Sequence, residues 1–439
     1  MSERTITRRF FVNKVCLAAV GAWGAAAIRP RPAPAAVSRA AANEKIVLGF
    51  IGAGGMGRSH FDRLCAHPEV TFAAVADPDR QRLNAAQTHA AGYGMNIEIY
   101  VDFREMLERH PDIDAVFVTT PDHWHALATV HCLRAGKDVY CEKPLALTIA
   151  EGRAIVETAR RYGRIVQVGT MQRSDQGQFR HVCELVRNGR IGTVSKAVCF
   201  FDANPYHEYI TPEPPPDYLD WDFYLGPAPW RPFNRLIHPY NFRYFRDYSG
   251  GLLTDWGVHL FDIAQWGLGK DATSPVRIES ESEMYPDNMY EFPRFQHITY
   301  SYGDVEIEWW SDSKQHPFEP GQSYGTKFYG SEGEICVNRG GYWIHGKDGR
   351  VINEDLGLND VWLYASPGHH QDFFNAMRSR RPPVCDAETG HRATAISHLG
   401  NIAARAGRPV VYDPVKEAFS QDETASKLLH RPMRAPWRL

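Results

Sequence analysis

The chain has 439 residues, of which 43% are hydrophobic and 23% are charged. This composition excludes intrinsically disordered and fibrous proteins, and the length suits two globular domains. The formal net charge is −3, but residues 1–42 contribute +6 from seven Lys or Arg residues and one acid, which leaves −9 on the remainder. A net acidic chain argues against nucleic acid or an anionic membrane as a partner.

The N-terminus has the features of an export signal. Thr7-Arg8-Arg9-Phe10-Phe11 precedes an apolar stretch from Val15 to Ile28, and the arginine pair resembles a bacterial twin-arginine signal. The stretch is shorter than the run of about 20 residues that a spanning helix needs, so we expect no permanent membrane anchor. We therefore expect residues 1–42 to be a signal peptide and linker that directs the protein to the periplasm through the twin-arginine export machinery.

A dinucleotide-binding fingerprint follows the linker. The apolar run Ile46–Ile51 leads into Gly52-x-Gly54-x-x-Gly57 and a helical stretch, and a second apolar run, Val70–Ala76, ends at Asp77. The first glycine permits a tight turn, the second lets the backbone approach a pyrophosphate, and the third lets the helix pack on the sheet. The phosphates would lie at the helix N-terminus, where free N–H groups favour an anion.

Asp77 also indicates which dinucleotide binds. A carboxylate at the end of the second strand accepts hydrogen bonds from the ribose hydroxyls of NAD and repels the 2′-phosphate of NADP. We therefore predict NAD. Arg80 and Arg82 follow closely and keep NADP open as the alternative.

Strands and helices continue to alternate as far as residue 170. The strands are short, continuous apolar runs, which are typical of parallel strands buried on both faces. The pattern predicts an α/β, doubly wound Rossmann domain over residues 43–170. Its further expected strands are Ala115–Thr119, Asp138–Cys141 and Ile165–Val168, and its expected helices include Phe103–His110, His125–Ala135 and Ile149–Tyr162.

Aromatic residues, prolines and long β-like segments become frequent after residue 170. They predict a C-terminal α+β domain over residues 171–412 with a large open, mainly antiparallel sheet. An extended tail, 413–439, is too proline-rich at its end for a helix and is suited to strap a neighbouring surface. The expected strands are Val194–Asp202, Val276–Tyr285, Gln296–Tyr302, Val305–Ser311 and Gly325–Tyr329, and the expected helices are Leu252–Trp266, His369–Arg380 and Gly390–Ala406.

The seven cysteines that follow Cys16 lack the spacing of a disulfide framework or a zinc site. We expect them to be buried free thiols, with a single bridge between Cys183 and Cys199 as the alternative.

Two groups of polar residues have the pattern of a catalytic site. Glu142-Lys143-Pro144 follows the strand that ends at Cys141, at the edge of the sheet where open α/β folds bind ligands. A lysine there can hold an alkoxide or relay a proton, and a solvated turn lysine is the structural alternative.

The second group is Asp255, His259 and Asp262. On a helix Asp255 and His259 share one face at i, i+4, and a carboxylate beside an imidazole fixes its tautomer and raises its basicity, as a general base requires. A metal site formed with Asp262, and a purely structural Asp–His pair, are the alternatives; we predict no metal.

These motifs together resemble the Gfo/Idh/MocA oxidoreductase family over Lys45 to about Val411, and specifically its exported members. The resemblance is carried by Gly52-Ala-Gly-Gly-Met-Gly57, Ala76-Asp77-Pro78-Asp79, Thr120-Pro121-Asp122-His123-Trp124-His125, Glu142-Lys143-Pro144 and Gly250-Gly-Leu-Leu-Thr-Asp255-x3-His259. It implies that Lys143 and His259 flank the nicotinamide with Asp255 assisting, and that the open sheet builds a homo-oligomer. The implied cofactor contacts are Gly52, Gly54, Gly55, Met56, Gly57, Asp77, Thr120, Pro121, His125, Glu142, Lys143 and Gln172.

The expected reaction moves a hydride between a secondary hydroxyl of a sugar or cyclitol and nicotinamide, with His259 as the base and Lys143 stabilising the alkoxide. The expected substrate contacts are Lys143, Arg173, Trp221, Tyr240, Arg243, Tyr244, Asp255 and His259. Ordinary packing is the alternative for the aromatic members. His123 and His125 either line the cofactor side or cap the next helix.

Export raises a difficulty, because free NAD is scarce outside the cytoplasm. One resolution is tightly bound NAD that passes hydride from one sugar to another. The alternative is a redox-neutral NAD-dependent glycosidase, in which oxidation is followed by elimination, hydration and re-reduction, and which needs a further base such as Tyr206, His207 or Tyr240. A second alternative is a dinucleotide-binding scaffold without turnover.

Overall fold

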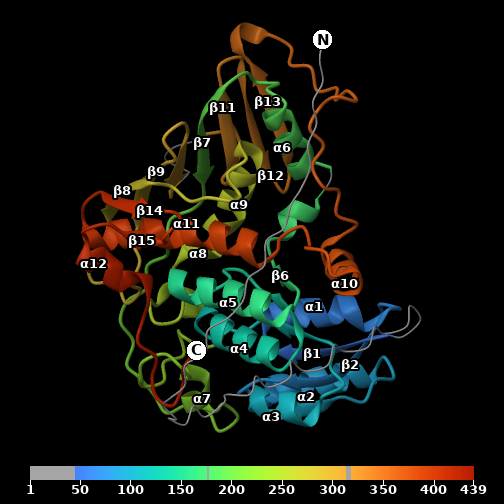
Figure 1. Ribbon diagram of the computed structural model, residues 1–439. Helices are drawn as coiled ribbons and strands as arrows, with labels where there is room; N and C mark the ends of the chain where they lie inside the picture. Colours follow the sequence, from blue (N-terminus) through green and yellow to red (C-terminus); the bar gives the residue numbers. More distant parts are fainter. Residues whose placement is uncertain (1–44, 176, 313–317) are drawn as a thin grey trace, which may run out of the picture. The chain divides into compact units, whose positions relative to one another are not determined.

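A six-stranded parallel sheet and a nine-stranded mixed sheet organise the residues that the computed structural model describes, which are 45–175, 177–312 and 318–439 (Figure 1). All of them belong to one compact unit, Asn43–Leu439. The export signal expected in residues 1–42 lies outside the described residues. Within the described ranges, no helix combines the length and apolar character needed to cross a membrane.

The parallel sheet has the strand order β3-β2-β1-β4-β5-β6, which is the order of a doubly wound dinucleotide-binding domain. The predicted Rossmann domain is therefore confirmed. Only β3 was missed, because three residues are too short to form a recognisable apolar run. The strands are β1 (Ile46–Ile51), β2 (Val70–Ala76), β3 (Glu98–Tyr100), β4 (Ala115–Val118), β5 (Asp138–Cys141) and β6 (Val166–Val168).

Side-chain caps and a left-handed glycine set the ends of helices in this domain. Asp79 caps α2 by accepting hydrogen bonds from the N–H groups of Gln81 and Arg82, and Thr148 caps α5 in the same way. Gly163 ends α5 in a left-handed conformation. The helices are α1 (Gly55–Cys65), α2 (Arg80–Ala91), α3 (Phe103–Arg109), α4 (Asp122–Arg134) and α5 (Ile149–Tyr162).

The second sheet has the order β13-β12-β11-β7-β10-β9-β8-β14-β15, and only the pair β7 and β10 is parallel. This confirms the mainly antiparallel sheet. The sequence did not indicate β12 and β13, because their glycine-rich pattern interrupts the expected alternation. The strands are β7 (Val194–Phe200), β8 (Arg277–Glu283), β9 (Phe295–Ser301), β10 (Glu306–Trp310), β11 (Gly325–Gly330), β12 (Gly333–Asn338), β13 (Gly341–Gly346), β14 (Val410–Asp413) and β15 (Ala418–Phe419).

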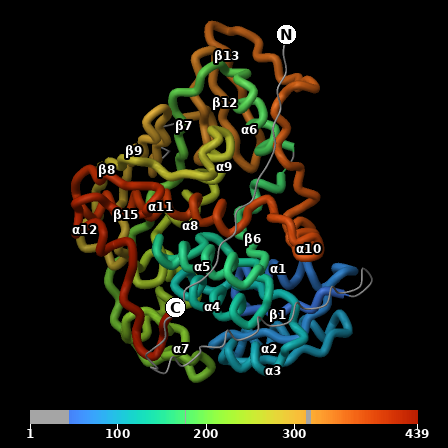
Figure 2. The backbone as a smooth tube through the Cα atoms, viewed as in Figure 1, coloured from blue at the N-terminus to red at the C-terminus, as the bar shows by residue number. Residues whose placement is uncertain are grey.

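Helices cover one face of this sheet. Figures 1 and 2 show α11 (Ala387–Ala406) running between α5 of the Rossmann domain and the second sheet, and α10 (His369–Ser379) lying beside α1. On the helical face, Trp309 and Tyr300 are completely buried in the main core. The opposite face carries the partly buried rings of Trp310, Tyr329 and Trp343. The remaining helices are α6 (Phe179–Arg187), α7 (Trp221–Leu225), α8 (Leu252–Asp255), α9 (Gly257–Leu268) and α12 (Glu423–Ser426).

Two expected elements differ from the structure. The single helix expected over Leu252–Trp266 is divided at Trp256 into α8 and α9, so Asp255 ends one helix and His259 lies in the first turn of the next. The tail expected to be extended from residue 413 instead begins with the β14–β15 hairpin and contains α12. Its last residues do lie across the Rossmann domain, where Trp437 packs edge-on against Trp124 at 4.9 Å between ring centroids.

An aromatic segment between β7 and α8 packs against the nucleotide-binding edge of the Rossmann domain. Leu219 forms a β-bridge with Asp79, and the Arg80 N–H donates to the Tyr218 carbonyl at 2.9 Å. These contacts hold α7, and with it Tyr224, next to the ends of the parallel strands. The segment has its own small core that includes Trp221 and Phe245.

The seven cysteines among the described residues are buried free thiols, as expected. The alternative bridge between Cys183 and Cys199 is wrong. The Cys183 thiol faces the Ile263 carbonyl at 3.7 Å, whereas Cys199 faces Thr326 on the neighbouring strand at 4.0 Å.

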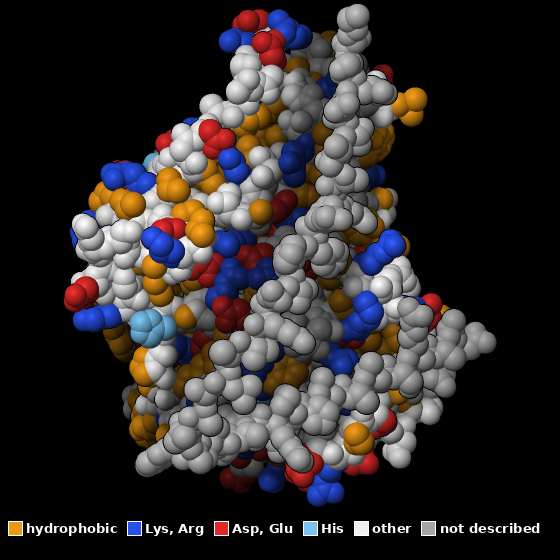
Figure 3. All heavy atoms as spheres, in the orientation of Figure 1, with side chains coloured by type: hydrophobic (Ala, Val, Ile, Leu, Met, Phe, Trp, Pro, Cys, Tyr) orange, Lys and Arg blue, Asp and Glu red, His pale blue; other side chains and the backbone are white. Residues whose placement is uncertain are grey.

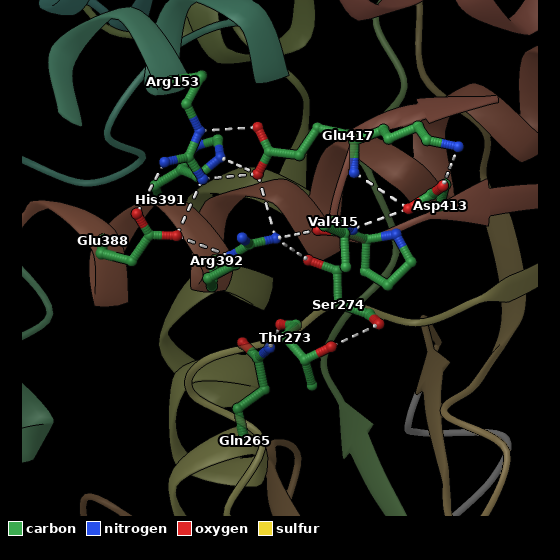
Figure 4. A network of polar contacts seen from close by, with 12 residues as sticks. Arg153, Gln265, Thr273, Ser274, Glu388, His391, Arg392, Asp413, Val415 and Glu417 are labelled. Atoms are coloured by element: carbon green, nitrogen blue, oxygen red, sulfur yellow. Dashed lines mark hydrogen bonds and ion pairs between the residues drawn. The ribbon is translucent and has the colours of Figure 1, made fainter. Parts of the chain in front are cut away.

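A network of ion pairs joins α5 to α11 and to the β14–β15 hairpin (Figure 4). Arg153 on α5 contacts Glu388 and Glu417, each at 2.8 Å, and His391 and Arg392 on α11 also contact Glu417. On the face in Figure 3, Lys and Arg side chains lie among Asp and Glu side chains, including the region between the two sheets. Opposite charges therefore help to dock the Rossmann domain against α11.

This network predicts acid sensitivity. Burial raises the pKa of Glu388, but its hydrogen bond to Arg153 and the charges of Arg153 and Arg392 outweigh burial and hold the pKa at about 2, below the ordinary 4.5. The depressed pKa contributes stability that is fully present above pH 4.5 and is lost as the pH falls toward 2. Glu388→Gln should therefore lower the melting temperature most above pH 4.5, and calorimetry should show this difference shrinking toward pH 2. Glu157→Gln, at an exposed position on α5, is the control; a pH-independent difference for Glu388→Gln would contradict the prediction.

Candidate functional site

The glycine turn after β1 has the geometry that a pyrophosphate requires. Gly52 has a φ of +95°, which favours glycine, and a Cβ added at Gly57 would lie 2.1 Å from the Gly52 carbonyl oxygen. Gly54 precedes α1 without a side-chain cap, so the first N–H groups of that helix, at Gly55, Met56 and Gly57, have no helical partner. These groups form the anion-binding end of α1.

The ribose end of the fingerprint lies beside this turn. The Asp77 carboxylate accepts from the Ala53 N–H at 2.7 Å and from the Asp79 N–H at 2.8 Å, and it is only 4% exposed. Burial raises the pKa of Asp77, and the charge of Arg82 opposes this effect. Each carboxylate oxygen retains a lone pair, which allows both to accept further hydrogen bonds.

One pocket brings five of the twelve predicted cofactor residues together. Gly52, Gly54, Asp77, Thr120 and Pro121 all line it. The Thr120 hydroxyl is buried and has no hydrogen-bond partner among the described residues, which leaves it free for a ligand. The other wall is made by Trp124, which belongs to one of the motifs that carry the family resemblance, and by Phe223 and Tyr224, to which the sequence analysis assigned no role. The residues therefore fit a dinucleotide, whose nicotinamide supplies the hydride acceptor or donor when it is bound.

His125 and Glu142 shape this region from within the core. The two ring nitrogens of His125 contact the carbonyls of Pro144 and Thr120, at 2.6 and 2.8 Å. Glu142 pairs with His60 of α1 at 2.8 Å; burial alone would raise the pKa of Glu142, but His60 lowers it to about 2. Both residues hold the loops that present Lys143. His123 is buried against the Tyr224 carbonyl at 2.9 Å.

Lys143 and Asp255 form an ion pair between the two domains. The Lys143 ammonium donates to the Asp255 carboxylate at 2.6 Å and to its backbone carbonyl at 2.8 Å, and Arg243 approaches the same carboxylate at 3.3 Å. Burial alone would raise the pKa of Asp255, but the two cations hold it well below its ordinary value. Asp255 therefore remains ionised and positions Lys143.

His259 is a buried imidazole next to this ion pair. It is 5% exposed, and its Nδ1 is buried without a hydrogen-bond partner among the described residues. Burial, followed by the charges of Lys143 and Arg339, holds the pKa of His259 well below 6.5. The imidazole is neutral near pH 7 and can accept a proton. The expected Asp255–His259 contact is absent from the hydrogen bonds of the described chain, because the break at Trp256 separates the two side chains and Asp255 is engaged by Lys143.

Gln172 and Arg339 flank His259 on its other side. With its amide oriented to satisfy both neighbours, Gln172 donates to the His259 carbonyl at 3.0 Å and accepts from the Arg339 Nε at 3.3 Å. The Arg339 guanidinium lies 4.7 Å from the centre of the Trp256 ring. Nothing in the local sequence around Arg339 indicated this role, because it lies in a glycine-rich turn far from His259 along the chain.

Two predicted substrate contacts lie away from this site. Arg173 is buried and bonded to Asp262 at 2.7 Å, so neither residue faces the ion pair and the metal alternative with Asp262 fails. Trp221 stacks on Tyr224 at 5.0 Å within the aromatic core.

One cluster with metal-binding potential occurs within the described ranges, Glu319, Glu334 and His345, but the Lys327 ammonium ion-pairs with both of its glutamates.

Tyr240 and Tyr244 lie near the ion pair, as expected. The Arg243 guanidinium is 4.3 Å from the centre of the Tyr240 ring, which is 60% exposed. Burial, aided by the charge of Asp255, raises the pKa of Tyr244 to about 12. Among the bases considered for elimination, Tyr206 packs on Tyr285, with 5.6 Å between the ring centroids, and forms no hydrogen bond with Lys143 or Asp255 among the described residues. His207 packs on Tyr290, with 5.7 Å between the ring centroids, and Tyr290 in turn packs on Tyr244.

Comparison with known families identifies this arrangement. Residues 46–170 match a family described as an oxidoreductase family with an NAD-binding Rossmann fold, and residues 193–321 and 343–439 match the C-terminal alpha/beta domain of the same family. The chain belongs to the Gfo/Idh/MocA oxidoreductase family. Its first sheet is therefore the family's NAD-binding domain, and its second sheet belongs to the family's C-terminal domain.

Individual members of the Gfo/Idh/MocA family share only part of their sequence with this chain. The chain is 27% identical over 350 residues to the rhizopine catabolism protein MocA of Rhizobium meliloti, covering 80% of this chain and 92% of that protein. It is 37% identical over 229 residues to the inositol 2-dehydrogenase of Burkholderia multivorans, covering 52% and 56%. The chain spans only about half the length of several curated relatives that it matches. The aldose-aldose oxidoreductase of Caulobacter crescentus, complexed with glycerol, shares the fold with a TM-score of 0.59 and 20% identity over 84% of this chain and 100% of that one.

The glycine turn gives a matched pair of variants. Gly57→Ala places a Cβ 2.1 Å from the Gly52 carbonyl and 2.7 Å from the Thr119 hydroxyl, so the turn must shift and NAD affinity should fall at least about tenfold. Gly55→Ala meets nothing within 4 Å and should bind NAD as the parent does. Calorimetric titration with NAD, after circular dichroism has verified folding, measures both affinities. Equal affinities would show that NAD binding does not require the close packing of α1 against the Gly52 turn.

Proposed function

We propose that this protein is an NAD-dependent oxidoreductase that moves a hydride between nicotinamide and a secondary hydroxyl of a sugar or cyclitol. The family and its NAD-binding domain support the redox class. The substrate class is supported by the names of relatives, an inositol 2-dehydrogenase and an aldose-aldose oxidoreductase. The observation that carries the mechanism is a neutral, buried imidazole beside a lysine whose partner is an ionised aspartate.

In the proposed oxidation His259 accepts the proton of the substrate hydroxyl. Its depressed pKa keeps the imidazole unprotonated and therefore competent as a base near neutral pH. The Lys143 ammonium stabilises negative charge on the substrate oxygen, and Asp255 holds that ammonium in place at 2.6 Å. The buried setting strengthens both interactions because water is excluded.

Several finer properties form part of the proposal. Asp77 makes NAD the preferred dinucleotide, and tight retention of NAD would let the protein work after twin-arginine export to the periplasm. A homo-oligomer would cover the sheet face that carries Trp310, Tyr329 and Trp343, whose rings are only partly buried in the single chain.

The decisive experiment combines mass spectrometry and absorbance on the mature protein with a panel of free sugars, cyclitols and aryl glycosides. Bound NADH together with a keto product would support the dehydrogenase or a hydride shuttle. Release of aglycone without net NADH would replace it with a redox-neutral glycosidase. Bound NAD with neither product would favour a scaffold without turnover.

His259→Asn tests the base. Because the amide cannot accept the hydroxyl proton, turnover should fall at least about a hundredfold while NAD affinity stays within about threefold of the parent. Stopped-flow absorbance of NADH and calorimetric titration with NAD measure the two quantities. His430→Asn, at an exposed position, is the control. Retained turnover in His259→Asn would exclude His259 as the base.

Asp77→Ala tests the dinucleotide preference. Loss of the carboxylate removes acceptors for the ribose hydroxyls and also removes the repulsion of a 2′-phosphate, so NAD affinity should fall while NADP affinity falls less or rises. Titrations with both dinucleotides give the ratio of the two affinities. An unchanged ratio would show that Asp77 does not distinguish the ribose of NAD from the 2′-phosphorylated ribose of NADP.

A further inference from the structure

Arg339 occupies a turn that is held in place by a buried side chain. Asn338, which is 1% exposed, accepts from the Gly340 N–H at 2.7 Å and donates to Gln322 at 2.7 Å and to the Tyr324 carbonyl at 3.1 Å. These bonds tie the β12–β13 turn to the segment before β11. The turn therefore presents Arg339 at a defined position rather than on a loose loop.

The Arg339 guanidinium lies within the catalytic region. It lies 4.7 Å from the centre of the Trp256 ring, and Trp256 itself stacks on Phe201 at 4.5 Å. Its Nε donates to Gln172, which in turn holds the His259 carbonyl. The Arg339 charge is close enough to lower the pKa of His259. Only the Nε is engaged by a hydrogen bond in the described chain, so the two terminal nitrogens are available.

The cations at this site differ in the carboxylates that they contact. Lys143 and Arg243 share the carboxylate of Asp255, and Glu142 pairs with His60. Arg339 forms no ion pair with any of the described residues, although the protein around its guanidinium lowers its pKa through desolvation. An arginine that contacts no carboxylate and has free terminal N–H groups can form charge-assisted hydrogen bonds with an anionic ligand. The residue is also exposed, so a ligand can reach it.

The position of Arg339 is not part of the family pattern that matches this chain. The two matched segments of the C-terminal domain end at residue 321 and resume at 343, so the turn lies in the stretch between them. A loop that a rigid sheet holds beside the proposed catalytic residues is suited to set substrate choice.

We infer that the substrate of this enzyme carries an anionic substituent and that Arg339 is the specificity-determining residue that binds it. The inference rests on the proposed oxidoreductase function and adds the chemical class of its substrate, an acidic sugar or cyclitol. A guanidinium presents parallel N–H groups that match a carboxylate or a phosphate through two hydrogen bonds. Trp256 holds the guanidinium plane, and the neighbouring Tyr324 ring, 5.3 Å from Trp256, adds a wall on which a sugar ring can rest.

The test uses substrate pairs that differ in charge and little else. NADH formation by the holoenzyme is measured with D-glucose, D-glucuronate, methyl D-glucuronate and D-glucose 6-phosphate, with the galactose series, and with myo-inositol and quinate. At least one anion should exceed its neutral partner in kcat/KM by about tenfold or more. A preference for a uronate or quinate would identify the anionic substituent as a carboxylate. A preference for the 6-phosphate would identify it as a phosphate.

Two variants assign the preference to Arg339. Arg339→Gln removes a charge and a hydrogen bond near His259 and therefore affects both substrates, but it should lower kcat/KM for the anion at least about tenfold more than for the neutral partner, and Arg339→Lys should retain part of the preference. NAD titration and the melting temperature verify that each variant is folded and loaded. Equal use of anions and neutral partners by the parent, or a preference that survives in Arg339→Gln, would overturn the inference. Failure to bind NAD, or a lack of NADH formation with every compound, would instead overturn the proposed function on which it rests.

Discussion

The ion pair between Lys143 and Asp255 is the interaction on which the site depends. Lys143 follows the last residue of β5 in the parallel sheet, whereas Asp255 ends α8 in the second domain, and the two side chains meet at 2.6 Å. Both are largely withdrawn from solvent, with side chains 13% exposed. A buried pair of this kind requires both partners, because either charge alone would be left desolvated. Correct docking of the two domains is therefore coupled to assembly of the proposed catalytic residues.

The electrostatics of His259 follow from this arrangement. The i, i+4 spacing of Asp255 and His259 predicts that the carboxylate holds the imidazole directly and raises its basicity. In the structure the carboxylate serves Lys143, and burial together with two nearby cations keeps His259 neutral. The same base is available, but its protonation is governed by desolvation and by cationic neighbours rather than by an Asp–His hydrogen bond.

Two further contacts support the docking of the domains. On one side, the Arg153 network ties α5 to α11 and to the β14–β15 hairpin. On another, the aromatic segment before α8 contacts the Rossmann domain through Leu219 and places Tyr224 in the wall of the cofactor pocket. The cofactor pocket is thus built from both domains, although its fingerprint lies entirely in the first.

The sequence by itself determined the Rossmann domain, the mainly antiparallel second sheet and the residue types of the catalytic group. These rest on local signals: apolar runs of strand length, glycines at motif spacing, and Lys143 at a strand end. Only the tertiary structure decided which polar residues meet. Arg173 and Asp262 satisfy each other in the core, and Trp221 packs among other rings. Gln172 and Arg339 meet near His259 although they lie 87 residues before it and 80 residues after it in the sequence. Such pairings depend on how distant segments pack and on which charged groups are desolvated. Neither can be derived from periodicity or spacing along the chain.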